Sequence, residues 1–214
     1  MTRSGIALIV SGALLVVGMA LVSVLESNRA RRSSSQSPTL PVVRSLASVA
    51  VVDQSNTHLT LADLHGRPWV VNLIFTRCPG PCAQLTGVMR EIQRGLPPGS
   101  AARLMSITSD PDHDTPEVLS RYAAKFGADT TRWKFVTGDR AEIRRLAVQE
   151  FLFVLQDKPE SQRESSDDLF LHSTLMAVVD GRGQLRGVVE GLEPGAAGRI
   201  LAMLQQVEAE TGRP

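Results

Sequence analysis

Residues 69–82 read WVVNLIFTRCPGPC, a pattern in which a buried strand runs directly into the start of a helix. The first seven positions form a continuous apolar run with β-branched side chains, which is typical of a central strand covered on both faces. Prolines follow, and they are tolerated in the first turn of a helix because the N–H groups there lack helical partners. We therefore predict a strand at residues 69–75 and a helix at residues 79–94.

The segments on either side alternate between strand and helix patterns. We expect strands at residues 46–52, 57–61, 103–108, 133–136, 174–179 and 184–190, and helices at residues 115–126, 140–148 and 194–210. Asp114 is expected to cap the helix that follows it, with Pro116 in the first turn. The sequence DGRG at residues 180–183 favours a hairpin. This order predicts a three-layer α/β domain.

The N-terminal region predicts a membrane anchor. After a flank at residues 1–4, residues 5–25 carry no charge, and residues 26–41 are polar and serine-rich, which indicates a flexible linker. At about 1.5 Å per residue, the uncharged stretch spans the roughly 30 Å hydrocarbon core. A cleaved signal peptide would have a shorter apolar stretch, about 7–15 residues, and a small-residue cleavage site. We predict an uncleaved transmembrane helix at 5–25 and one folded domain at 42–214.

The composition excludes several classes of protein. The formal net charge is +1, so the chain has no overall electrostatic attraction to nucleic acid. The glycines at 181, 183 and 187 lie between two predicted strands and not at the start of a helix, so they do not indicate a dinucleotide site. Two cysteines are too few for a disulfide-stapled scaffold. Their closeness, at positions 78 and 82, indicates chemistry instead.

Cys78 and Cys82 lie where the predicted strand ends and the helix begins. The free N–H groups and partial positive charge of a helix N-terminus stabilise a thiolate, and we expect Arg77 to add to this effect. Residues at i and i+4 of a helix have Cβ atoms about 5–6 Å apart, whereas a disulfide needs about 3.5–4.5 Å. Thioredoxin-type oxidoreductases use the closer C-x-x-C spacing. The spacing favours a soft metal ion, with redox exchange at the same pair as the alternative.

The four histidines are the candidates for a third ligand, because thiolate and imidazole together suit copper or zinc. His58 and His65 lie in polar turn regions and are interpreted as surface residues. His113 belongs to the segment SDPDHD at 109–114, which indicates loop and helix-cap chemistry and lacks an EF-hand pattern. His172 is predicted at the start of an apolar strand, at the sheet edge where strand-end loops gather. Its position alone leaves both a structural and a ligand role open.

Three motifs together resemble the Sco/SenC family. FTRCPGPC at 75–82 is similar to its signature F-T-x-C-P-x-x-C, and HST at 172–174 is similar to its H-S-x strand motif. SDPDHDTPEVL at 109–119 is similar to its segment S-x-D-P-x-x-D-T-P-x-x-L, apart from the register of the first aspartate. The resemblance covers about residues 46–204. Ala83 stands where the family usually has proline, a departure that bears on partner specificity.

The resemblance implies a thioredoxin-like fold and a copper chaperone that builds the dinuclear copper centre of cytochrome c oxidase subunit II. Carried over by position, Cys78 and Cys82 are the sulfur ligands of a copper ion and His172 is its imidazole ligand. The resemblance also implies a single-pass protein of the cytoplasmic (inner) membrane whose soluble domain faces the periplasm or cell exterior. The arginines at 29, 31 and 32 oppose that orientation under the positive-inside rule, although long domains translocate despite such flanks.

The predicted function is therefore a metallochaperone more than an enzyme. The alternative is a thiol–disulfide reductase that keeps partner cysteines reduced, in which Cys78 and Cys82 are catalytic. Thioredoxins place a cis-proline beside their cysteines, whereas residues 171–173 read LHS, and this difference argues against a general oxidoreductase. A peroxidase is a third class on the same broad fold. It needs one dominant peroxidatic cysteine in a suitable pocket, and only the fold supports it.

Overall fold

The structure is a computed structural model that describes residues 19, 22–23, 39–78, 80–165 and 167–211. Most of the predicted anchor at 5–25 and linker at 26–41 lies outside these residues, as does Pro79. Within the described ranges, no helix is both long and apolar enough to span a bilayer. Leu40–Pro214 forms one compact unit, and its fold follows.

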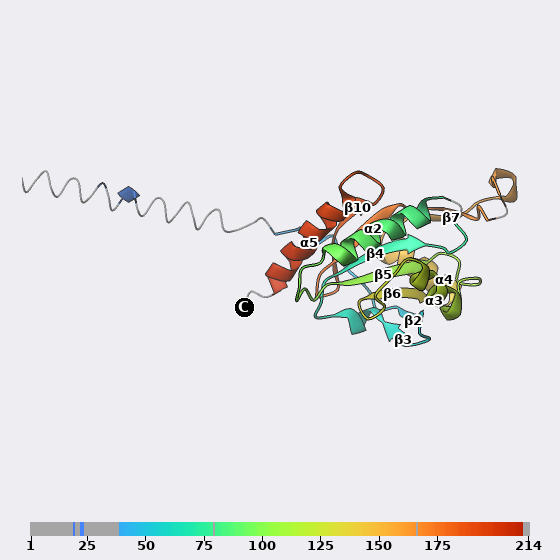
Figure 1. Cartoon of the computed structure of the whole chain (residues 1–214), viewed down its shortest axis with the longest axis horizontal. Coiled ribbons are helices and arrows are strands. Elements are labelled where there is room, and N and C mark those ends of the chain that lie inside the picture. Colours follow the sequence, from blue (N-terminus) through green and yellow to red (C-terminus); the bar gives the residue numbers. More distant parts are fainter. Residues whose placement is uncertain (1–18, 20–21, 24–38, 79, 166, 212–214) are drawn as a thin grey trace, which may run out of the picture. The chain divides into compact units, whose positions relative to one another are not determined.

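A sheet of eight strands runs through the described part of this unit (Figure 1). Its spatial order is β1 (Arg44–Ser45), β10 (Gln184–Glu190), β9 (Leu175–Val179), β4 (Trp69–Ile74), β5 (Arg103–Thr108), β6 (Trp133–Thr137), β2 (Ala50–Asp53) and β3 (His58–Thr60). β4, β5 and β6 are parallel, and β9 and β10 form the predicted antiparallel hairpin. The carboxyl ends of β4 and β5 therefore meet at one edge of the sheet, which is where the cysteine loop begins.

Helices cover both faces of the sheet. α2 (Pro81–Gly95) lies beside α5 (Ala196–Thr211) in Figure 1, and a hydrogen bond of 2.9 Å between Thr86 and Tyr122 joins α2 to α3 (Pro116–Lys125). The opposite face is covered by the segment that follows α4 (Arg140–Arg145) and its π-helical turn, Leu146–Glu150. The predicted three-layer α/β arrangement is confirmed, with short 3₁₀ turns at Leu61–Leu64 and Glu160–Gln162 between the main elements.

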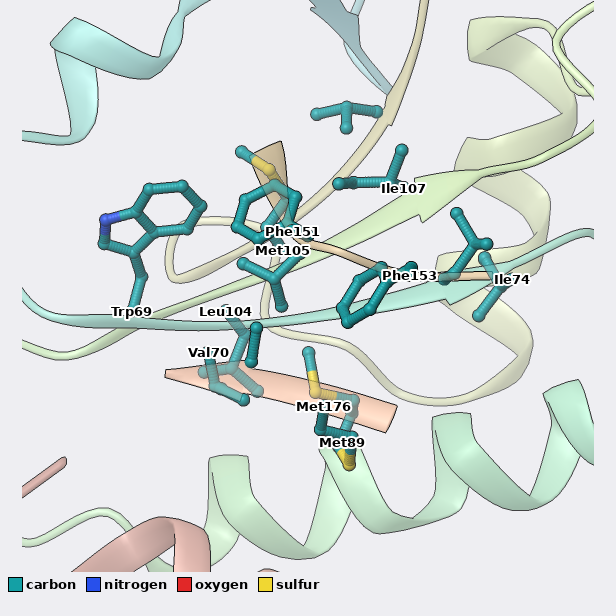
Figure 2. Close-up of a cluster of buried hydrophobic side chains, with 14 of the residues drawn as sticks. Trp69, Val70, Ile74, Met89, Leu104, Met105, Ile107, Phe151, Phe153 and Met176 are labelled. Atoms are coloured by element: carbon teal, nitrogen blue, oxygen red, sulfur yellow. The ribbon is translucent and has the colours of Figure 1, made fainter. Parts of the chain in front are cut away.

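The core has one apolar layer on each side of β4 (Figure 2). The layer beneath α2 contains side chains with at most 1% exposure, namely Val70, Met89, Leu104 and Met176. In the opposite layer, Phe151 packs edge-on against Trp69 with ring centroids 5.8 Å apart and stacks on Phe153. Burial on both faces explains the continuous apolar run of this strand, because each side chain meets a packed layer. β4 is thus a firm base for the loop that it leads into.

The predicted helix starts differ from the observed ones by one or two residues at α2, α3 and α5. α2 begins at Pro81 rather than Pro79, with Gly80 at the N-cap position, so Cys78 precedes the helix. α3 is capped by Thr115, whose hydroxyl accepts from the backbone N–H of Val118, and the prediction that Asp114 caps it is wrong. Asp114 is fully buried and turns towards the cysteine loop instead.

The strand that contains His172 was not expected. β7 (Leu155–Asp157) and β8 (Phe170–His172) form a separate two-stranded antiparallel ribbon. His172 ends β8, whereas the predicted strand at 174–179 begins only at Leu175. Each ribbon strand has three residues, which is too short for an alternating pattern to emerge from the sequence. The ribbon, and not the main sheet, therefore positions the histidine.

Candidate metal centre

The structure brings together the three residues predicted as ligands. The Sγ atoms of Cys78 and Cys82 and a ring nitrogen of His172 all lie within 4.8 Å of one another. His172 Nε2 is 3.2 Å from the Cys82 sulfur and 3.9 Å from the Cys78 sulfur. Donors bound at about 2.0–2.3 Å around a trigonal metal ion lie about 3.5–4 Å from each other. The 3.9 Å separation lies in this range and the 3.2 Å separation is slightly shorter, so a small shift of the imidazole would admit one ion. The role of the three residues as ligands stays a prediction.

Each of the three residues comes from a different element. Cys78 lies in the loop after β4 and is partly buried, Cys82 is in the first turn of α2 with 1% exposure, and His172 comes from β8. The predicted helical i, i+4 geometry of the two cysteines is wrong, because Gly80 and Pro81 start the helix only after Cys78. The loop position leaves one sulfur accessible while the helix buries the other.

The two thiols differ strongly in acidity. A hydrogen bond from the Cys82 thiol, helped by the backbone N–H groups of Cys82 and Gly80, lowers the pKa of Cys78 to about 4. Burial, followed by the hydrogen bond to Cys78 and by the negative charge of Cys78, raises the pKa of Cys82. Near neutral pH the shared proton therefore stays on Cys82, and Cys78 is a thiolate.

Arg77, next to Cys78 in the sequence, pairs with two carboxylates. Its guanidinium donates to Asp110 at 2.8 Å and lies 3.6 Å from Asp167. The expectation that Arg77 adds to the stability of the thiolate stays a prediction, and carboxylates on two other loops compete for its charge. The arginine instead ties the cysteine loop to the segment that follows β5.

The imidazole of His172 is oriented by two contacts. Its Nδ1 lies 3.2 Å from the backbone oxygen of Ser173, a bond that requires the ring proton on Nδ1. The lone pair of Nε2 then faces the sulfurs, as a metal ligand requires. The ring also packs edge-on against Phe75 at 5.6 Å, and Phe75 packs in the same way against Phe170 at 5.3 Å. This packing limits rotation of the imidazole.

Asp114 supports the cysteine loop, a role that the sequence did not reveal. Its carboxyl oxygens accept from the backbone N–H of Thr76 at 3.0 Å and from the hydroxyls of Thr76 and Thr108 at 2.5 Å. His113 Nδ1 lies 3.0 Å from the same carboxyl group, so His113 is directed at Asp114 and not at the sulfurs. The sequence held one signal for this role. Asp114 and Thr115 are adjacent and both can cap a helix, but one helix needs only one capping residue, so one of the two was available for another contact.

Comparison with known proteins identifies the family. The SCO1/SenC family model matches residues 46–207. This chain belongs to the SCO1/SenC family. It is similar to the SCO1 protein homolog of Bacillus subtilis (strain 168), with 28% identity over 143 residues that cover 66% of this chain and 71% of the relative. The family inferred from the three motifs is confirmed.

Solved structures of SCO1/SenC relatives share the fold. Bradyrhizobium japonicum ScoI with copper bound has a TM-score of 0.64 and 20% identity, covering 76% of this chain and 98% of that one. BsSco, described as a member of the Sco family of cytochrome c oxidase assembly proteins, has a TM-score of 0.69 and 23% identity, covering 81% and 99%. The predicted thioredoxin-like fold is confirmed.

A cavity of about 460 Å³ opens beside the cysteine loop of this SCO1/SenC chain. Cys78, Gly80 and Pro81 line it from the loop, and His172 lines it from the ribbon. Cys82 is not among the lining residues, in agreement with its 1% exposure. A molecule that approaches the centre from this cavity therefore meets the Cys78 sulfur and the imidazole first.

Proposed function

We propose that this protein is a copper-binding metallochaperone whose ion is held by Cys78, Cys82 and His172. The observation that carries the proposal is the convergence of these three donor atoms within 4.8 Å. Two sulfurs and one imidazole nitrogen form a soft donor set, which suits copper(I). Bradyrhizobium ScoI, a relative with the same fold, is described with copper bound. A set of three protein donors also leaves the ion open to an incoming ligand.

The proposed recipient is the dinuclear copper site of cytochrome c oxidase subunit II. The description of BsSco as a cytochrome c oxidase assembly protein supports this recipient. The uncharged stretch at 5–25 supports an anchor in the cytoplasmic membrane, and the family resemblance supports a soluble domain on the periplasmic or outer side. An activity reporter fused after Pro214 tests the orientation, and activity confined to the cytoplasm would refute it.

Copper titration of the reduced full chain in detergent tests the ligand set. We expect the parent to bind one copper(I) ion in competition with a chelator. His172→Ala should weaken binding by about 100-fold or more, because losing a ligand exceeds the 10–100-fold effect of losing a supporting contact. His58→Ala is the matched control, since His58 is an exposed residue of β3 and is not among the three donors. Equal affinity of His172→Ala and the parent would reject the three-ligand set.

A thiol–disulfide reductase is the second candidate, and the asymmetry of the two thiols favours it. The pKa of Cys78 is lowered to about 4 and its side chain borders a cavity, whereas Cys82 is buried and protonated. The Cys78 thiolate would attack a partner disulfide, forming a mixed disulfide and releasing one partner thiolate. Cys82, after losing its proton, would attack the Cys78 sulfur and release the second, so that two electrons pass to the partner.

Trapping and redox measurements separate this candidate from the first. If the reductase operates, Cys82→Ser should accumulate the mixed disulfide with a cysteine-pair substrate, because the resolving thiol is missing. The parent pair should also oxidise and reduce reversibly against a glutathione series. A pair that never oxidises reversibly would exclude the reductase while leaving copper binding intact.

A further inference from the structure

The ribbon that carries His172 has one unpaired edge. The backbone N–H of Ser173 donates to Val154 at 2.9 Å, and that of Lys158 donates to Leu169 at 2.8 Å. Hydrogen-bonded and non-hydrogen-bonded pairs alternate along an antiparallel ribbon. The backbone N–H and C=O groups of the odd-numbered residues of β8 and its flanks therefore face β7, whereas those of Phe170 and His172 face away from it. Within the described residues, the backbone groups of Phe170 and His172 have no hydrogen-bond partner. An edge of this kind is a template for another strand.

This unpaired edge borders the cavity beside Cys78. All three residues of β8 line the cavity, whereas no residue of β7 does. Gly80 also lines the cavity, and a Cβ atom added to it would meet nothing within 4 Å. Paired strands lie about 4.8 Å apart, so an extended chain needs little width beyond its own backbone. The cavity therefore adjoins β8, the strand whose unpaired edge offers hydrogen-bonding groups.

We propose that this cavity receives an extended, cysteine-bearing segment of the copper-exchanging partner, which pairs with β8 as a third strand. The proposal rests on the metallochaperone function proposed above. Residues opposite each other on paired strands project to the same face. A cysteine opposite His172 would therefore project towards the centre, as the imidazole does, and would meet the Cys78 sulfur.

The neighbours of that cysteine would project to the other face of the ribbon. Leu171 and Val154 lie on that face, and they are 53% and 48% exposed. Apolar side chains directly before and after the partner cysteine would cover them. The segment is thus expected to alternate, with a cysteine between two apolar residues, which is also a pattern that favours an extended conformation.

The exchange itself is a substitution at the copper ion, which is the cargo. The partner thiol loses its proton and its sulfur bonds to copper, while the bond between copper and the Cys78 sulfur breaks. The proton passes to the cysteine pair that copper leaves, and copper keeps its oxidation state. Cys78 is the ligand to leave first because it borders the cavity, whereas Cys82 is buried.

Backbone-methylated peptides test the strand pairing. The probe is the five-residue peptide Thr-Val-Cys-Val-Thr with blocked ends, added to the reduced, copper-loaded full chain in detergent. Alternate N–H groups of an extended peptide point to opposite edges. One variant is N-methylated at the cysteine and threonine amides, and the matched variant is N-methylated at the two valine amides, so each variant lacks the N–H donors of one edge of the peptide. We expect one variant to take up copper about tenfold more slowly than the parent peptide, because two hydrogen bonds are lost, and the other to match it. Equal rates for all three peptides would overturn the proposal.

A second readout does not depend on copper. In the reduced, copper-free full chain, the same peptide with serine in place of cysteine should slow amide hydrogen exchange at Phe170 and His172. Leu171→Asp should weaken this protection several-fold, while Val42→Asp, a control at a residue 52% exposed on a different segment, should not. Protection of these amides without copper binding by the protein would support the strand pairing with β8 and refute the proposed function. Copper transfer without protection of these amides would refute the strand pairing and leave the proposed function standing.

Discussion

Replacing Asp114 with alanine is expected to destabilise the domain and to loosen the cysteine loop. The side chain is fully buried, and its carboxyl group accepts from the Thr76 backbone, the Thr76 hydroxyl and the Thr108 hydroxyl. Alanine would leave these three donors without their acceptor, with the Thr108 hydroxyl buried and the two Thr76 groups partly buried. Thr76 is two positions before Cys78, so the loss acts directly on the segment that positions the first sulfur.

The magnitude follows from the number of donors left unpaired. A buried donor that loses its partner costs about 1–3 kcal/mol, so three donors in the lower half of that range give about 4 kcal/mol. The fourth partner, His113, is 39% exposed and can turn to water, so it adds little. A domain is typically stable by about 5–15 kcal/mol, and the variant should therefore unfold at a much lower urea concentration.

Urea unfolding of the full chain in detergent, followed by tryptophan fluorescence, measures this loss. Trp69 and Trp133 are 1% and 0% exposed, so their emission reports unfolding of the core. Asp112→Ala is the matched control, because Asp112 is 67% exposed and its surface pair with Arg140 is worth about 0–1 kcal/mol. If Asp114→Ala is too unstable to purify, Asp114→Asn should still cost about 2 kcal/mol, because in either orientation its NH2 group faces a group that donates to Asp114, namely the Thr76 hydroxyl or the Thr76 N–H.

The reasoning about Asp114 would be refuted by a loss of less than about 1 kcal/mol in the alanine variant, comparable to the exposed control. It would also fail if the variant were strongly destabilised but bound copper as tightly as the parent. In that case the cysteine loop would keep its geometry without this support, and Asp114 would serve the fold alone.

Two further predictions concern the thiols and a buried ion cluster. Because the pKa of Cys78 is lowered to about 4, its thiolate persists above that pH and is lost only as the pH falls through 4. The rate at which iodoacetamide alkylates Cys78 should therefore change less than about twofold between pH 6 and 8, while Cys82 stays unmodified. Mass spectrometry of digested samples checks this, and a tenfold rise per pH unit would contradict it. Arg186 is 7% exposed and pairs with Asp180 and Glu210. The substitution Arg186→Met should lower the free energy of unfolding by about 3–5 kcal/mol, measured by urea unfolding. The exposed control Arg199→Met should cost less than about 1 kcal/mol, and equal losses would refute the importance of burial.

Local patterns predicted the elements that bury a long apolar face. The strand at 69–75, the strand at 103–108 and the hairpin around 180–183 were found where expected, because their apolar runs and turn residues act over a few neighbouring positions. The three-residue strands β7 and β8 were missed, since they carry no period to detect. Asp114 was misassigned as a cap because its true partners, Thr76 and Thr108, are brought to it only by the pairing of β4 with β5.

The sequence by itself determined that a strand runs into a helix at two closely spaced cysteines, and its three motifs indicated the family. Only the tertiary structure decided the burial, the acidity and the neighbours of those cysteines. Packing brings His172 to within 3.2 Å of Cys82, from 90 positions along the chain, and it buries one thiol while leaving the other beside a cavity. Acidity, accessibility and ligand geometry depend on burial and on contacts between distant segments. No local pattern encodes those contacts, whereas folding around β4 creates all of them together.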